Sequence, residues 1–164
     1  MIALLHGYVY GLGIDLSAAC DIRLCAADAR FSVKEVDIGI AADLGTLTRL
    51  PVVVGGNGSW VKEVSLTGRE FRAPEAERVG FVSGVCKDKE GLVKEGLGLA
   101  ERIAGKSPLA VVGTKHLLDA TTGMGVDEHL RYTAAWNASA LQSGDVGTAV
   151  TAVGERRKPR FAKL

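Results

Sequence analysis

The chain has 164 residues, of which 47% are hydrophobic, and its 20 Lys and Arg residues against 19 Asp and Glu residues leave a formal charge of +1. This length predicts one domain with a sizeable core. The balanced charge argues against a nucleic-acid surface. Cys20, Cys25 and Cys86 form no Cys-x-x-Cys pair, so we expect neither a disulfide framework nor a metal site. No apolar run approaches the roughly 20 residues that span a bilayer, so we expect no membrane span.

The N-terminal part of the chain has the pattern of an α/β layer architecture. Met1 leads directly into a strand-like stretch, residues 2–6, which suggests a chain cut on its N-terminal side. Glycines punctuate residues 6–13, which predicts a loop, and apolar spacing predicts a short helix over residues 13–22. Strands are expected over residues 22–26 and 30–33. This order implies a crossover between parallel strands.

From residue 44 onward the pattern is mainly helical. Pro51 is expected to halt a first helix, Asn57 to cap a second that closes on Gly68, and Pro74 to lie in the first turn of a third. Residues 81–88 alternate as a strand does. Further helices are expected in three stretches, residues 89–104, 109–123 and 126–158.

Three carboxylates, Asp15, Glu35 and Asp43, lie among Gly, Ile, Val and Ala residues. Charged side chains are seldom buried unless they are paired or used in chemistry. Asp15 follows a glycine turn, residues 11–13, whose backbone N–H groups at a helix start favour an oxyanion site. The three acids lie at the ends of separate elements and can converge on one pocket. The alternatives are that Asp43 is the N-cap of the following helix and that the other two are surface charges.

The stretch HGYVYGLGIDLSAACDIRLCAADARF, residues 6–31, resembles the signature of the enoyl-CoA hydratase/isomerase (crotonase) superfamily. Within it, VKEVDIGIAADLGTLTRLP, residues 33–51, is most similar to the Δ3,5-Δ2,4-dienoyl-CoA isomerase branch. The resemblance covers essentially the whole chain. It implies an α/β fold with a crotonase-like β-β-α spiral over residues 1–105, partial because its N-terminal turns are missing. A helical trimerisation region would then span residues 106–158, and residues 159–164 would form a tail.

The resemblance also implies roles for the site residues in converting a 3,5-dienoyl-CoA to a 2,4-dienoyl-CoA in unsaturated fatty-acid β-oxidation. Glu35 would be the base at C2, Asp43 the proton donor at C6 and Asp15 a polar support of the pocket. Gly11 and Leu12 would supply the oxyanion and substrate-binding backbone, although the family usually has glycine at the position of Leu12. The substrate would be an acyl-CoA thioester, and no metal or redox cofactor would be required.

Two alternatives to the isomerase stay open. Hydratases of the family usually lack an acid at the position of Asp43, and an enoyl-CoA hydratase would use Asp15 and Glu35 as a water-activating pair. The other alternative is a catalytically incomplete piece, because the family's N-terminal portion carries the second oxyanion donor and much of the CoA-binding surface.

The tail and the helices suggest partners beyond the substrate. Ala162-Lys163-Leu164 is close to the Ser-Lys-Leu address of peroxisomal proteins, which predicts an import receptor as partner and the peroxisome as location, with the mitochondrion as alternative. The family's assemblies imply a homotrimer or hexamer that uses the apolar helices of residues 109–153.

Overall fold

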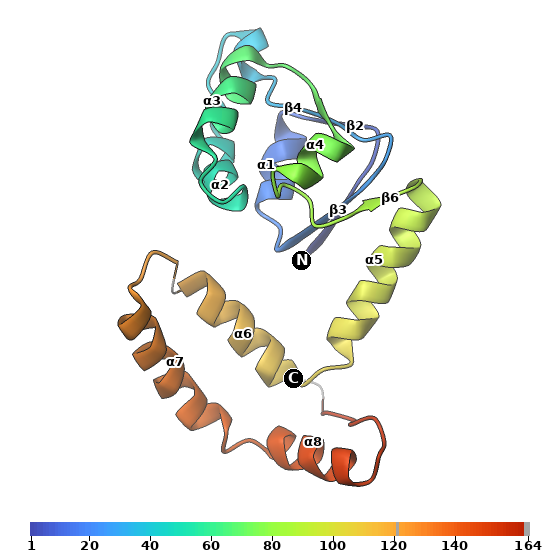
Figure 1. The fold of residues 1–164 in the computed structure, drawn as a ribbon, viewed down its shortest axis with the longest axis vertical. Helices are drawn as coiled ribbons and strands as arrows, with labels where there is room; N and C mark the ends of the chain where they lie inside the picture. Colours follow the sequence, from blue (N-terminus) through green and yellow to red (C-terminus); the bar gives the residue numbers. More distant parts are fainter. Residues whose placement is uncertain (121, 163–164) are drawn as a thin grey trace. The chain divides into compact units, whose positions relative to one another are not determined.

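A computed structural model describes residues 1–120 and 122–162 of the chain. The chain divides into two compact units, Met1–Gly98 and Leu99–Leu164, where the sequence predicted one domain by its length. The division lies within helix α5 (Lys89–Ala104), and the boundary after residue 105 that the resemblance implies stays a prediction. Figure 1 shows the elements in chain order.

A parallel sheet carries the N-terminal strand of the first unit. It has the order β1-β3-β6, with β1 (Ile2–Leu5), β3 (Ile22–Ala26) and β6 (Val85–Cys86). Ile2 pairs with Ile22 in the β1–β3 register. Helix α1 (Leu12–Ala18) lies between these two strands in the chain, so the predicted crossover is confirmed. The strand expected over residues 81–88 is confined to β6.

A second sheet, β2-β4-β5, corrects one expectation. Residues 6–13 were expected to be a loop, but they contain β2 (Tyr8–Tyr10), which pairs in parallel with β4 (Arg30–Ser32). The alternation of residues explains the strand, because Val9 is buried in the core while Tyr8 is exposed. β5 (Phe71–Arg72) pairs antiparallel with β4 and places Phe71 on Phe31, with ring centroids 5.2 Å apart.

Four helical segments complete the first unit before α5. They are the 3-10 helix η1 (Glu35–Ile38), α2 (Thr46–Val53), α3 (Gly58–Thr67) and α4 (Ala73–Arg78). Asn57 caps α3 by accepting a hydrogen bond from Trp60 N at 3.4 Å, and Gly68 ends α3 at φ 61°, as predicted. Pro74 lies in the first turn of α4, as predicted.

Pro51 does not halt α2, contrary to expectation. The helix continues to Val53, and the amide of Val54 still donates to Leu50 O at 3.1 Å. A proline removes only its own N–H bond. Leu50, fully buried in the core, holds the rest of the turn in place.

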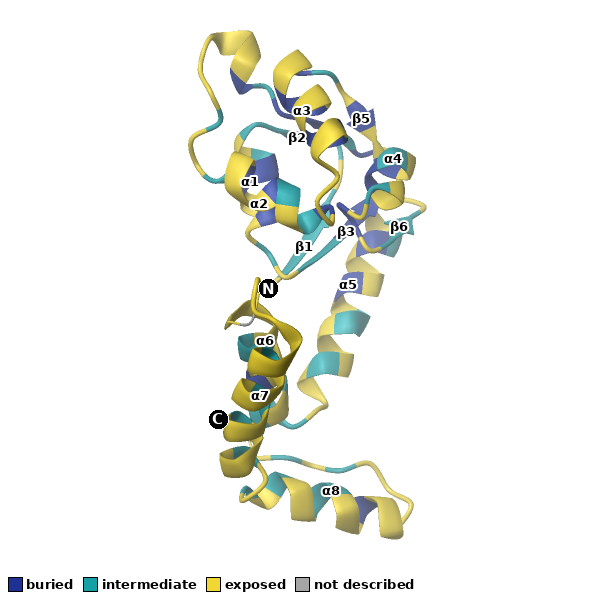
Figure 2. Cartoon of the chain, turned by 60° about the vertical axis from the view of Figure 1, so that its left-hand side comes forward, coloured by how far each residue is buried: buried dark blue, intermediate teal, exposed yellow. Residues whose placement is uncertain are grey.

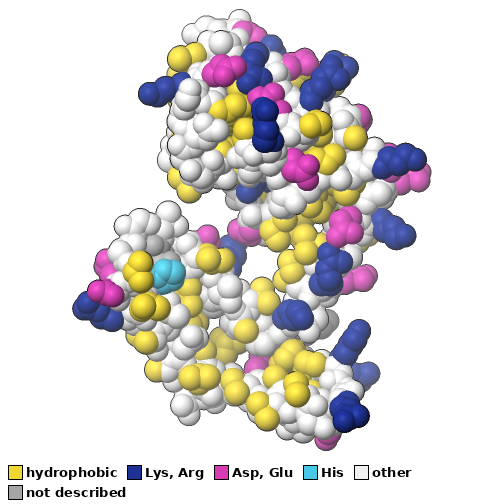
Figure 3. All heavy atoms as spheres, in the orientation of Figure 1, with side chains coloured by type: hydrophobic (Ala, Val, Ile, Leu, Met, Phe, Trp, Pro, Cys, Tyr) yellow, Lys and Arg dark blue, Asp and Glu magenta, His cyan; other side chains and the backbone are white. Residues whose placement is uncertain are grey.

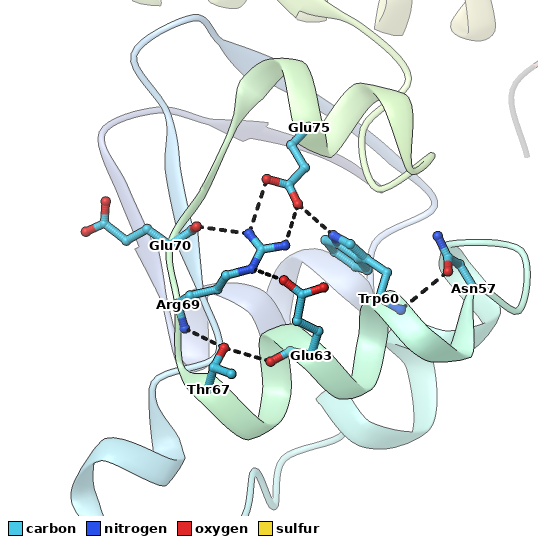
Figure 4. A network of polar contacts seen from close by, with 7 residues as sticks. All are labelled: Asn57, Trp60, Glu63, Thr67, Arg69, Glu70 and Glu75. Carbon is cyan, nitrogen blue, oxygen red and sulfur yellow. Dashed lines mark hydrogen bonds and ion pairs between the residues drawn. The ribbon is translucent and has the colours of Figure 1, made fainter.

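The core of the first unit is formed by side chains of both sheets and of helices α1 to α4. Figure 2 shows the buried residues gathered in these elements. A polar network ties α3 to α4 at the edge of this core: Arg69 donates to Glu63 at 2.6 Å and to Glu75 at 2.7 Å, and Trp60 Nε1 donates to Glu75 at 2.8 Å (Figure 4). The hydrogen bond from Arg69 is the main cause that lowers the pKa of the Glu75 carboxyl.

The second unit contains α6 (Pro108–Ala120), α7 (Val126–Ala140) and α8 (Gly144–Gly154). His116 on α6 stacks on Trp136 of α7 with ring centroids 4.6 Å apart, and its Nε2 lies 2.8 Å from Tyr132 Oη. Gly113 permits this packing, because a Cβ there would meet Trp136 Nε1 at 2.5 Å. Among the described residues, no helix is long and apolar enough to cross a membrane.

Candidate active site

Asp15 is buried in the middle of α1. The residue is 4% exposed, so the interpretation as a surface charge is wrong. Asp15 Oδ1 accepts two hydrogen bonds from Thr46, one from the backbone N at 2.7 Å and one from Oγ1 at 2.8 Å. Both donors are neutral, and each satisfies part of the hydrogen-bonding demand of a buried carboxylate.

Glu35 opens η1 and is also buried, at 9% exposed, so it too is not a surface charge. Among residues 1–120 and 122–162, its Oε2 is one of two buried side-chain oxygen or nitrogen atoms without a hydrogen-bond partner; the other is Ser65 Oγ. Leaving a carboxylate oxygen buried and unpaired is costly, so such an atom in a native fold calls for an explanation, and catalysis is one.

Gly11 lies against both buried acids. A Cβ at this position would lie 3.1 Å from Glu35 Oε1, and the backbone N of Asp15 donates to Gly11 O at 3.3 Å. Gly11 adopts φ 50° and ψ −114°, a conformation that favours glycine, and its N–H donates to Ser32 O at 3.0 Å. The turn before α1 therefore brings Glu35 and the start of the Asp15 helix together.

Leu12 is the first residue of α1 and is half exposed. The N–H groups of a helix's first turn have no acceptor within the helix, so the amide of Leu12 points out of its N-terminal end. Its service as an oxyanion donor stays a prediction.

Asp43 lies in the segment of residues 39–45, between η1 and α2, and is exposed. Its sequence neighbours are apolar like those of Asp15 and Glu35, but unlike those two acids it is not buried. It is not the N-cap of α2 either, because that position is Gly45, which has no side chain to offer. Asp43 is three residues from Thr46 and so lies close in the chain to the partner of Asp15, but no described contact joins it to either buried acid.

The two buried acids, Asp15 and Glu35, are suited to proton transfer. Among the described residues, neither Lys nor Arg forms an ion pair with any of the three acids. The same residues contain no cluster of three His, Cys, Asp or Glu side chains that could hold a metal ion. A buried carboxyl with one unpaired oxygen can take a proton from, or give one to, a group placed beside it.

Sequence reasoning missed Thr46. Gly45 has no side chain to cap α2, so Asp15 of α1 accepts the hydrogen bond from the backbone N of Thr46 at the start of α2 instead. A signal was present, since a hydroxyl residue directly after a glycine at a predicted helix start is a candidate partner for a buried acid nearby. Only the packing of α1 on α2 identifies which acid that is.

Comparison with known proteins gives a consistent set of relatives. The profile of the enoyl-CoA hydratase/isomerase family matches residues 1–163. The peroxisomal Δ(3,5)-Δ(2,4)-dienoyl-CoA isomerase of Arabidopsis thaliana is 49% identical over 164 residues, which are 100% of this chain and 58% of that protein. The mitochondrial Δ(3,5)-Δ(2,4)-dienoyl-CoA isomerase of Homo sapiens is 48% identical over 167 residues, covering 100% of this chain and 51% of that protein.

Solved structures agree on the fold. The crystal structure of an enoyl-CoA hydratase from Mycobacterium tuberculosis H37Rv superimposes with a TM-score of 0.91 at 30% identity, over 99% of this chain and 64% of that one. The chain spans about half the length of the curated relatives it matches.

Proposed function

The chain belongs to the enoyl-CoA hydratase/isomerase family, and we propose that it carries the catalytic carboxylates of a Δ3,5-Δ2,4-dienoyl-CoA isomerase. The expected crotonase fold is confirmed by the solved relatives. The observation that carries the proposal is Glu35, a buried acid with an unpaired oxygen beside the Gly11 turn. The isomerase names of the similar plant and animal proteins support the choice of reaction.

In the proposed reaction, Glu35 removes a proton from C2 of a 3,5-dienoyl thioester. The electron pair left at C2 spreads through the diene and onto the thioester oxygen, and a backbone N–H at Leu12 would stabilise that charge. Asp43 then delivers a proton to C6, so that the double bonds move to positions 2 and 4. One proton leaves the substrate and one is added, and no electrons are gained or lost. Asp15 would hold the pocket wall through Thr46.

An enoyl-CoA hydratase is the second candidate. The exposure of Asp43 favours it, because a hydratase would use only Asp15 and Glu35, and these two acids are buried. The likeness to a structure named as an enoyl-CoA hydratase supports it as well.

The two candidates differ in their substrates. We would assay the chain, and any longer reading frame that contains it, with a 3,5-dienoyl-CoA and with a 2-enoyl-CoA. Turnover of the first to a conjugated 2,4-dienoyl-CoA, seen by its ultraviolet absorbance, is the expected result. Hydration of the second without isomerisation of the first would favour the hydratase. If neither substrate is turned over by the chain or by any longer protein that contains it, a catalytically incomplete member of the family is favoured.

The same proposal includes assembly into a homotrimer or hexamer through α6, α7 and α8. Among the described residues of α7 none is buried, and apolar side chains that include Val112, Leu130 and Val150 are exposed on these helices. Figure 3 shows hydrophobic side chains on the visible face of the second unit, which contains these helices. Exposed apolar surface of this kind is typical of subunit interfaces. Sedimentation as a monomer at micromolar concentration would contradict the assembly.

The location is proposed from the tail. Relatives are named as peroxisomal in a plant and as mitochondrial in animals, so either compartment fits the family. We place this protein in the peroxisome because of Ala162-Lys163-Leu164, of which residues 163 and 164 lie outside the described residues. A fluorescent reporter ending in residues 155–164 should enter peroxisomes and lose that import when Leu164 is deleted; a diffuse signal from both reporters would contradict the proposal.

A further inference from the structure

In the described part of the chain, the Asp15 carboxyl is held by a single residue, Thr46, through two hydrogen bonds to one oxygen, which is more than a polar support of the pocket requires. Both hydrogen bonds from Thr46 go to the same oxygen, Oδ1, at 2.7 and 2.8 Å. Thr46 is fully buried and Asp15 nearly so. Two short hydrogen bonds to one oxygen fix the carboxyl group in one orientation, and the side chain of Thr46 can then take only the rotamer that points its hydroxyl at Asp15.

The contact between Thr46 and Asp15 lies at the C-terminal end of the segment that carries Asp43. Residues 39–45 contain neither helix nor strand, and Asp43 within it is exposed. At its start, the segment is attached to Glu35, because the amide of Ile40 donates to Glu35 O at 3.1 Å. At its end, it is attached to Asp15 through Thr46.

These contacts form a closed path through the site. The path runs from Glu35 along residues 39–45 to Thr46, and crosses to Asp15 by two hydrogen bonds. It returns by the bond from Asp15 N to Gly11 O at 3.3 Å, and Gly11 lies against Glu35 Oε1. A segment held at both ends samples fewer positions than one held at a single end.

We propose that Thr46 is a positioning residue that acts through Asp15 to fix the segment carrying Asp43 relative to Glu35. The inference rests on the proposed isomerase function, in which the two acids must serve opposite ends of one dienoyl group. Asp15 then holds the C-terminal end of residues 39–45 in place, and neither Thr46 nor Asp15 needs to exchange a proton with substrate. Placement of the donor within a fraction of an ångström is what such a reaction demands of the surrounding chain.

The test compares Thr46→Val, which removes the hydroxyl at nearly constant size, with Thr46→Ser, which keeps it. Thr48→Val is the matched control, because Thr48 is exposed on the same helix. Each variant is made in the chain and in the longest active reading frame that contains it. We measure kcat and KM for a 3,5-dienoyl-CoA, and amide hydrogen exchange of residues 39–46 by mass spectrometry.

We expect Thr46→Val to lower kcat by roughly tenfold, the size of effect of one hydrogen bond to a charged group, with KM nearly unchanged. Thr46→Ser should restore kcat to near that of the parent protein. Exchange over residues 39–46 should be faster in Thr46→Val than in Thr48→Val. In an Asp15→Ala background, Thr46→Val should cause no further fall in kcat, because the two residues act as one unit.

A kcat for Thr46→Val equal to that of the parent protein would overturn the proposal, as would an undiminished effect in the Asp15→Ala background. If Thr46→Val fails to fold in thermal denaturation, Thr46→Ala takes its place in the same comparison. If neither the chain nor any longer protein that contains it isomerises the substrate, the proposed function fails, but the positioning role of Thr46 can still be tested. Hydrogen exchange still tests the positioning role in that case. Equal exchange rates over residues 39–46 in Thr46→Val and Thr48→Val would overturn the role of Thr46.

Discussion

Replacement of Gly11 by alanine should impair the site in two separable ways. The backbone there has φ 50° and ψ −114°, a conformation that costs an L-residue on the order of 1–3 kcal/mol. The new Cβ would also lie 3.1 Å from Glu35 Oε1, so the carboxylate would have to move by a few tenths of an ångström. The first effect lowers the free energy of unfolding, and the second displaces the proposed base.

Gly7→Ala separates the two effects. Gly7 also has a positive φ, 61°, but a Cβ there would meet nothing within 4 Å. Both variants should lose unfolding free energy in urea denaturation, by about 1–3 kcal/mol each. Only Gly11→Ala should also lower kcat, on the order of tenfold, given that a misplacement of about 1 Å can cost ~100-fold. An equal kcat for the two folded variants would refute the reasoning that Glu35 is held against Gly11.

Three further predictions concern titratable groups of the first unit. Because the pKa of Glu75 is lowered, chiefly by its hydrogen bond from Arg69, the pair stabilises the fold above the ordinary carboxyl pKa of 4.5 and loses this effect as the pH falls through the lower folded-state value. Arg69→Gln should therefore cost about 1 kcal/mol in urea denaturation at neutral pH, and its difference from the parent protein should shrink in acid; a constant difference would contradict this. The hydrogen bond to Glu70, with desolvation second, raises the pKa of Tyr10 to about 12. Glu70→Ala should therefore lower the pKa of Tyr10, followed by ultraviolet absorbance, toward 10. An unchanged titration curve would refute the assignment. Burial raises the pKa of the Cys25 thiol to about 12, so a thiol reagent should label it last of the three cysteines, and early labelling would contradict its burial.

The parts of the fold that follow from local pattern were predictable from the sequence. Asn57 and Gly68 bound α3 as their types indicate, and the crossover of the first strands follows from the order of elements. The strand at Tyr8–Tyr10 was hidden by its flanking glycines, because only pairing with β4 distinguishes it from a loop. Pro51 was misjudged for a related reason, since the buried Leu50 keeps its turn helical.

The sequence pointed to Asp15 and Glu35 as unusual acids, but it did not predict the contacts around them. Asp15 and Glu35 are buried near one glycine turn, which agrees with the suspicion raised by their apolar neighbours. Asp43 has the same kind of neighbours but is exposed, because its segment lies between two elements instead of inside one. The role of Thr46 depends on which helix packs on which, and a single sequence does not record that.

The most direct test of the isomerase proposal is the initial rate of 3,5-dienoyl-CoA isomerisation by Asp43→Asn, beside Asp28→Asn as an exposed aspartate elsewhere in the same unit. Loss of a positioned proton donor typically costs about 10² to 10⁴-fold in rate. We expect Asp43→Asn to lose kcat by that amount with KM nearly unchanged, and Asp28→Asn to behave as the parent protein. An Asp43→Asn variant that isomerises the substrate at the parent rate would contradict the assignment of Asp43 and favour the hydratase.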